Sequence, residues 1–166
     1  MNESNGPVDD LPHVVAYVDG NCPSYQGSGG YGVVLECRGV RKEIAEGLRG
    51  TTNPRMDLMG AIAALKALTE RCRVVVRCDS EYVVKGVEQG WAKRWRERGW
   101  VKADKTPAAN VDLWDELLGL CDEHAVSFEW AKSGSLPELR RCWEIASKVA
   151  CRGDLETDAR TKREAA

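Results

Sequence analysis

Two short β-branched runs that each end at an aspartate constrain the fold of this chain more than any other feature. "HVVAYV" is followed by Asp19 and "RVVVRC" by Asp79, and both runs have the length and composition of buried strands. Between them, residues 54–71 carry apolar side chains at intervals of three and four, with Pro54 at the start, which predicts a helix. If the two strands are neighbours, both aspartates emerge at the same edge of one sheet.

The remaining segments predict a sheet with helices on its faces. Residues 31–39 and 40–50 have strand length and a short connection, as in consecutive hairpins. Residues 110–124 predict a helix with Asn110 as its N-cap, residues 125–131 predict a strand, and a last helix follows the loop "KSGSLPE". This order of elements calls for a mixed sheet and places the chain in the α/β class.

The length of 166 residues suits one domain. We expect a disordered polar leader over residues 1–12, a domain over residues 13–152 and a polar tail over residues 153–166. Two acidic residues of that tail, Asp154 and Asp158, are expected to be solvated charges. The net charge of -2 does not by itself suggest a polyanionic partner, so any nucleic-acid surface must come from local clustering.

Cysteine usage and hydropathy bear on the compartment. The seven cysteines include no CxxC pair and no zinc-type spacing, so we expect reduced and mostly buried thiols. No stretch approaches 18 consecutive apolar residues, and the polar start lacks the apolar region of a signal peptide. We therefore expect a cytoplasmic protein that is monomeric and has no membrane segment.

Three carboxylates are candidates for a metal site. Asp19 and Asp79 each follow a strand, and Asp57 lies in the first turns of the predicted helix. Carboxylates that come close together repel one another and need a cation or a shared proton. Oxygen-only ligands suit Mg²⁺ or Mn²⁺. For any single one of these residues, a turn former or helix cap is the alternative interpretation.

A basic segment rich in tryptophan follows the second aspartate-ending strand. Residues 91–105 contain six basic and two acidic side chains, a local charge of about +4. Trp91 and Trp95 are four residues apart and share one helix face. Cations that meet phosphates, together with aromatic faces that pack on bases or sugars, are typical of nucleic-acid binding. The alternative is a surface helix whose tryptophans cover the core and whose arginines are solvated.

Six segments, in order from about residue 14 to residue 151, resemble the type 1 ribonuclease H family of bacteria. They are "YVDGN", "GSGGYGVVL", "TTNPRMDLMGAIAALKAL", "CDSEYVVKG", "WAKRWRERGWVKADKTPAANVDLW" and "FEWAK". The resemblance implies a ribonuclease H-like fold with a five-stranded mixed sheet, three antiparallel strands followed by parallel ones, flanked by helices. It also implies a two-metal site that hydrolyses the RNA strand of an RNA/DNA hybrid.

The resemblance also implies roles for single residues. Asp19, Asp57 and Asp79 match the family's metal-binding carboxylates, although the family usually has Glu where this chain has Asp57. The implied substrate contacts are Cys22, Thr52, Asn53 and Glu81 near the minor groove, and Trp91, Lys93, Trp95, Arg96, Arg98, Trp100 and Lys102 in the hybrid-binding protrusion. Pro54 and Tyr25 replace polar Asn residues of the family, which predicts fewer hydrogen bonds to the hybrid.

The last helix departs from the family pattern at the fourth carboxylate. Aligning Cys142 with the family's Cys requires one deletion in the preceding loop and places Trp143 at the ligand position. Counting without a gap from Trp130 places Glu144 there instead, as a fourth catalytic candidate. The family's loop His is missing, and His13 and His124 are expected to be structural.

Two functions follow from these observations. The first is a metal-dependent endonuclease that hydrolyses the RNA strand of RNA/DNA hybrids with Mg²⁺ or Mn²⁺, with atypical or reduced activity. The alternative is a catalytically degenerate module that binds hybrids without cleaving them. A weaker third interpretation assigns the tryptophan-rich segment to protein contacts. Steep salt dependence of hybrid binding would argue against this third interpretation.

Overall fold

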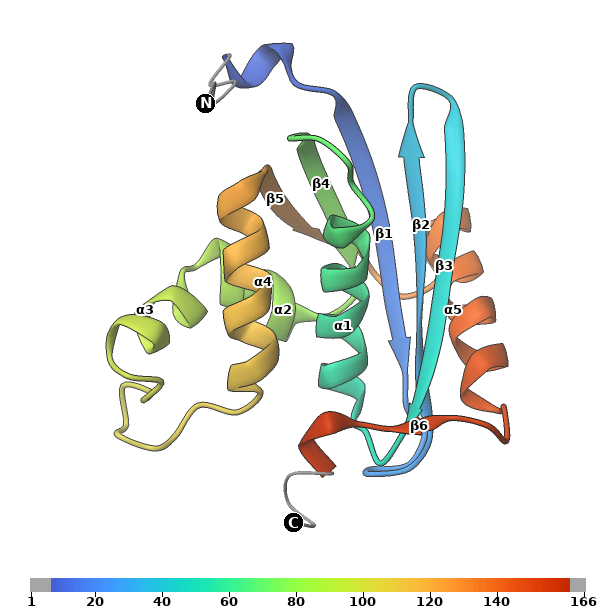
Figure 1. Cartoon of the computed structure of the whole chain (residues 1–166), viewed down its shortest axis with the longest axis vertical. Helices are drawn as coiled ribbons and strands as arrows, with labels where there is room; N and C mark the ends of the chain where they lie inside the picture. Colours follow the sequence, from blue (N-terminus) through green and yellow to red (C-terminus); the bar gives the residue numbers. More distant parts are fainter. Residues whose placement is uncertain (1–6, 162–166) are drawn as a thin grey trace.

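A mixed sheet forms the centre of the structure, a computed structural model that describes residues 7–161 (Figure 1). Its strands are β1 (His13–Asn21), β2 (Gly29–Cys37), β3 (Val40–Arg49), β4 (Arg73–Cys78), β5 (Ala125–Trp130) and β6 (Glu156–Thr157). The strand order is β5-β4-β1-β2-β3-β6. β1, β2 and β3 are antiparallel neighbours, and β4 and β5 continue the sheet parallel to β1. The predicted mixed sheet and α/β class are confirmed.

Helices cover both faces of the sheet. They are α1 (Asn53–Lys66), α2 (Glu81–Glu88), α3 (Trp91–Glu97), α4 (Val111–Glu123) and α5 (Pro137–Ala150). Figure 1 shows α1 and α4 in front of the sheet and α5 behind it. Successive side chains of β1 point to opposite faces, so Val18 packs at Gly60 of α1 while Tyr17 clusters with Leu139 and Cys142 of α5.

The main core lies between the sheet and the front helices. Trp114 of α4 is fully buried in it and packs edge-on against Tyr82 of α2, at 5.3 Å between ring centroids, and against Trp95 of α3, at 6.1 Å. The buried ring therefore ties the helix that carries the basic segment to the core.

The position of α5 is set by a close approach to β2. A Cβ atom at Gly32 would lie 2.1 Å from the carbonyl oxygen of Cys142, so the helix could not pack at this depth over any larger residue. The Sγ atom of Cys142 donates to the carbonyl oxygen of Tyr17 at 3.2 Å. These two contacts fix the rotation of α5 on the sheet.

The helices begin largely where the sequence predicts. Thr52 caps α1 and Ser80 caps α2, each through its side-chain oxygen. Asn110 precedes α4 as expected, but it adopts a left-handed backbone conformation and its side chain does not cap the helix. Its amide donates to the hydroxyl of Tyr82 instead, at 3.3 Å.

Both ends of the domain differ from expectation. Within the predicted leader, Val8–Asp10 form a short 3-10 helix, and residues 1–6 lie outside the described part. In the tail, β6 pairs with the edge of β3 and gives the sheet six strands instead of the five expected. The prediction that Asp158 is a solvated charge is wrong: its side chain is fully buried and bonds Arg55 and Thr51. Asp154 is exposed, as predicted.

Among residues 7–161, no helix is both long and apolar enough to cross a membrane.

Candidate active site

Three aspartates from three elements meet at one edge of the sheet. Asp19 lies near the end of β1, Asp57 lies in the first turns of α1, and Asp79 follows β4 directly. Each offers a carboxylate oxygen, and these oxygens lie within 4.8 Å of one another. β1 and β4 are parallel and pair up to Val18 and Cys78, so the residues that follow them emerge side by side. The sequence pattern thus locates all three members of the cluster.

Asp57 is held by the backbone of β1. The amide of Gly20 donates to Asp57 Oδ1 at 2.8 Å, and Asn53 Nδ2 lies 3.5 Å from Oδ2. A Cβ atom at Gly20 would lie 2.7 Å from both the backbone nitrogen and Oδ1 of Asp57. Glycine at this position therefore lets α1 approach β1 closely enough for its carboxylate to join the cluster.

Burial and mutual repulsion disfavour charge in this cluster. Asp19 and Asp57 are each only 4% exposed. Burial, and next the charge of Asp79, raises the pKa of Asp19 to about 7, while the Gly20 amide acts in the opposite direction. Burial, and next Asp79, also raises the pKa of Asp57 well above its ordinary value. A divalent cation would offset both effects, because it replaces lost hydration and screens the repulsion.

The donor set fits a hard divalent cation. All three ligands are carboxylates, and Mg²⁺ and Mn²⁺ prefer carboxylate and water oxygens to sulfur or imidazole. Asp79 is only partly buried, which leaves room for water or substrate oxygens on its side of the cluster.

Helix periodicity places Trp143 between the buried face of α5, with Cys142 and Ala146, and Ser147 on the flank nearest β1, and it directs Glu144 away from the sheet. Ser147, one turn after Trp143, accepts a hydrogen bond from Asn21 Nδ2 of β1 at 2.7 Å. Glu144 is exposed and bonds Arg141, its Oε2 lying 3.2 Å from Nη1. Trp143 is 53% exposed.

On the opposite flank of α5, Arg141 pairs with Glu43 of β3 at 2.7 Å. This pair holds the Arg141–Glu144 contact on the side of the helix away from β1. Within the described residues, the metal-ligand cluster contains the three aspartates and not Glu144.

Three of the four predicted minor-groove residues, Cys22, Thr52 and Asn53, lie beside Asp57. The backbone amide of Cys22 donates to Asn53 Oδ1 at 3.1 Å, and Thr52 caps the same helix turn. The Sγ atom of Cys22 donates to the carbonyl oxygen of Ser24 at 3.2 Å and closes its loop. Glu81 is exposed at the start of α2, two residues after Asp79.

The basic segment forms a separate surface on and after α3. Its groove of about 360 Å³ is lined by Trp91, Arg94, Trp95, Arg98, Lys102, Ala103 and Asp104. Lys93 and Arg98 are exposed, whereas Arg96 and Lys102 are half-buried. Trp95 and Trp100 pack against the main core, so these tryptophans support the fold as well as the surface.

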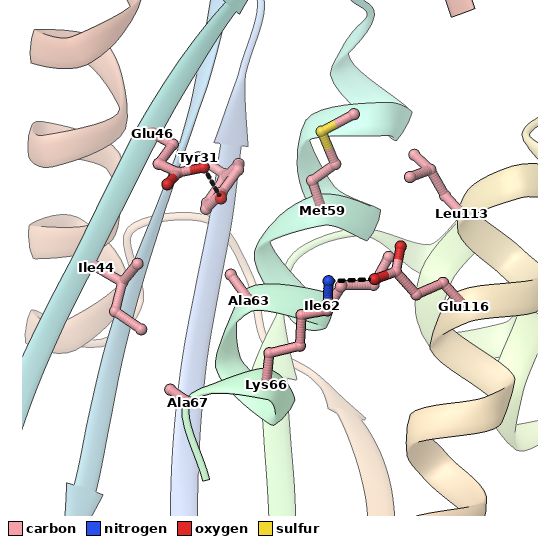
Figure 2. A pocket seen from close by; sticks show the side chains of 10 residues that line it. All are labelled: Tyr31, Ile44, Glu46, Met59, Ile62, Ala63, Lys66, Ala67, Leu113 and Glu116. Atoms are coloured by element: carbon pink, nitrogen blue, oxygen red, sulfur yellow. Dashed lines mark hydrogen bonds and ion pairs between the residues drawn. The ribbon is translucent and has the colours of Figure 1, made fainter. Parts of the chain in front are cut away.

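A larger groove lies elsewhere and contains none of the aspartates. It measures about 520 Å³ and lies between β3, α1 and α4. Figure 2 shows its apolar floor, with Met59 and Ile62 of α1, and two polar contacts at its rim. These are the Tyr31–Glu46 hydrogen bond and the Lys66–Glu116 ion pair.

Sequence reasoning gave no role to two side chains that support the site region. Trp130 donates through Nε1 to the carbonyl oxygen of Asp79 at 3.0 Å. Arg55 is buried and bonds Asp112 and Asp158. Trp130 and Asp79 are 51 residues apart, and Arg55 and Asp158 are 103 residues apart, so neither contact leaves a local pattern in the sequence. The position of Arg55 next to the start of the helix was the one sequence signal of its role.

The chain resembles known proteins over nearly its whole length. Residues 12–148 match the ribonuclease H family. Ribonuclease H of Desulforamulus reducens is 46% identical over 151 residues, which cover 90% of this chain and 95% of the relative. Ribonuclease H of Escherichia coli is 44% identical over 147 residues, which cover 88% of this chain and 94% of the relative. The structure of LC9-RNase H1, a type 1 RNase H with the type 2 active-site motif, aligns with a TM-score of 0.76 at 28% identity over 98% of this chain and 83% of the other. With three carboxylates gathered on this fold, the chain belongs to the ribonuclease H family, endonucleases that hydrolyse the RNA strand of RNA/DNA hybrids.

Proposed function

We propose that Asp19, Asp57 and Asp79 hold the divalent cations, Mg²⁺ or Mn²⁺, with which this ribonuclease H cleaves RNA/DNA hybrids. The observation that carries this proposal is the approach of their oxygens to within 4.8 Å at a buried edge of the sheet. When bound there, the cations would activate the attacking water and stabilise the leaving 3′-oxygen.

The protein's own groups fix this geometry before substrate arrives. The amide of Gly20 holds the carboxylate of Asp57, and Asp19 lies next to Gly20 in the same strand, β1. Since these groups are already in place, binding a cation requires little rearrangement, which favours catalysis by positioning.

Two surfaces would bind the hybrid. Cys22, Thr52 and Asn53 lie next to Asp57 and suit contacts close to the scissile bond. The exposed cations of the basic segment, including Lys93 and Arg98, suit phosphates farther along the duplex. We expect hybrid affinity to fall steeply with salt because of these phosphate contacts.

We also propose that cleavage is slow. The cluster has three carboxylates, and α5 offers the exposed indole of Trp143 on the flank where the family resemblance implies a fourth. Trp cannot ligate Mg²⁺, so one of the two cations would be weakly held. The same observation favours a second candidate function, a hybrid-binding module without catalytic activity.

Cleavage of an end-labelled RNA/DNA hybrid over a Mg²⁺ and Mn²⁺ titration separates these two functions. We expect metal-dependent cleavage that disappears in Asp79→Asn, which serves as the control for contaminating nuclease. Salt-sensitive binding without cleavage at any metal concentration would support the binding module instead. Cleavage that is unchanged in Asp79→Asn would reject the assignment of the metal ligands.

A further inference from the structure

Trp130 occupies an unusual place for a large aromatic residue. It is the last residue of β5, next to the carboxylate cluster, and its side chain is 51% exposed. Core packing therefore does not explain its position. Its indole Nε1 donates to the carbonyl oxygen of Asp79 at 3.0 Å, across the β4–β5 pair.

The peptide group that accepts this hydrogen bond lies at a structural transition. Asp79 stands between the end of β4 and Ser80, the N-cap of α2. On one side, the carbonyl of Cys78 accepts from the amide of Ala131 at 2.9 Å, which is the last contact of the sheet ladder. On the other side, the carbonyl of Ser80 accepts from Val84 at 3.1 Å, which is the first turn of the helix.

The carbonyl of Asp79 thus belongs to neither the ladder nor the helix. The indole supplies its partner and fixes the plane of the peptide that joins Asp79 to Ser80. The carbonyl carbon of Asp79 is one of the three backbone atoms, with N and Cα, that fix the direction of the Cα–Cβ bond, so holding this carbonyl in place helps to hold the direction in which the carboxylate leaves the chain. A displacement of this peptide, and of the Asp79 Cα with it, would move the Asp79 carboxylate relative to Asp19 and Asp57, which are held independently by β1 and α1.

We infer that Trp130 is a positioning residue for Asp79: its indole N–H fixes the Asp79–Ser80 peptide and thereby aims the carboxylate into the metal cluster. This inference rests on the proposed function, because it assumes that the cluster binds a divalent cation. It gives a role in the site to a β5 side chain that is not itself a metal ligand.

The test compares Trp130→Phe, which keeps an aromatic ring and loses the N–H donor, with the wild-type chain. Mn²⁺ binding to the free protein is measured by electron paramagnetic resonance without hybrid. We expect the dissociation constant to rise about three- to tenfold, the range for one lost hydrogen bond of ordinary strength. In hybrid cleavage at subsaturating Mn²⁺, kcat should fall while KM for the hybrid stays unchanged.

Val126→Ala is the matched control, because Val126 lies in β5 at the end far from the cluster and pairs with Val74. It should lower the melting temperature without weakening Mn²⁺ binding. Equal weakening in Val126→Ala and Trp130→Phe would overturn the inference by showing a general effect of a loosened strand. So would wild-type Mn²⁺ affinity in Trp130→Phe.

Asp79→Asn separates the inference from the proposed function. If it weakens Mn²⁺ binding while Trp130→Phe does not, only the role of Trp130 fails. If the wild-type chain itself binds no Mn²⁺ in the millimolar range, the proposed metal centre and the role of Trp130 fail together.

Discussion

Arg55 and Asp158, 103 residues apart, are joined by two hydrogen bonds in the interior, Nε to Oδ2 at 2.8 Å and Nη2 to Oδ1 at 2.9 Å. Asp112 at the start of α4 accepts hydrogen bonds from Nη1 and Nη2 along another edge of the same guanidinium. Thr51 donates to Asp158 at 2.7 Å, next to the cap of α1. The tail is therefore anchored against the segment that leads to Asp57.

Removing the buried partner should destabilise the whole domain. Asp158→Ala leaves Asp112 as the carboxylate partner of the Arg55 guanidinium, with Asn110 as a weaker acceptor, and we expect a loss of about 3 kcal/mol in unfolding free energy, the lower end of the range for breaking a buried pair. Urea denaturation measures this change. Asp154→Ala is the matched control, since its pair with Arg152 is exposed, and it should leave the denaturation midpoint unchanged. Similar midpoints for both variants would contradict the anchoring role.

The same pair predicts a contribution to stability that is lost in acid. Burial opposes ionisation of Asp158, but hydrogen bonds from Arg55 and Thr51 outweigh it and hold the pKa below its ordinary value. A carboxyl whose folded pKa is depressed stabilises the fold above its unfolded pKa of about 3.9, and this stabilisation is lost as pH falls through the folded pKa. Unfolding free energies measured from pH 6 to pH 2 should therefore fall less steeply in Asp158→Asn than in the wild-type chain.

The raised pKa of Asp19 predicts the opposite pH dependence of stability. Burial and the charge of Asp79 raise its pKa to about 7, so the charged form destabilises the metal-free fold at pH 8 and protonation relieves this as pH falls toward the unfolded value. Asp19→Asn should stabilise the metal-free protein at pH 8, by an amount on the order of a few kcal/mol. Thermal unfolding with chelator, and then with Mg²⁺, measures the effect. Added Mg²⁺ should raise the melting temperature of the wild-type chain more than that of the variant.

The close packing at Gly20 gives a prediction for the site geometry. The new methyl group of Gly20→Ala would lie 2.7 Å from the nitrogen and Oδ1 of Asp57, so α1 must shift and carry its carboxylate out of the cluster. We expect a loss of activity of about 100-fold, as is usual for a displacement of about 1 Å in a catalytic group. Initial rates of hybrid cleavage measure this loss. Gly119→Ala, on open surface of α4, is the control and should cleave at the wild-type rate.

The strands that carry Asp19 and Asp79 were predictable because each is a β-branched run whose aspartate marks the sheet edge. Asp57 was predictable because Pro54 and the apolar periodicity locate α1. The burial of Asp158 was not predictable, because the polar tail has no apolar periodicity and Arg55, the partner of Asp158, lies in another element. The contact of Trp130 with Asp79 depends on strand pairing across 51 residues, which no local pattern encodes.

Trp143 provides the last prediction, because α5 holds it on the flank toward β1 while Glu144 is paired with Arg141. Trp143→Asp would place a fourth carboxylate on that flank, and since its side chain is exposed, the change should not destabilise the core. We expect cleavage in Mg²⁺ to rise at least about tenfold, as a better-held cation lowers the barrier by about 1.4 kcal/mol. Glu144→Gln tests the other register and should change the rate less than about twofold, well under 1 kcal/mol. A large loss in Glu144→Gln with no gain in Trp143→Asp would show that the helix turns Glu144 toward the cations when substrate is bound.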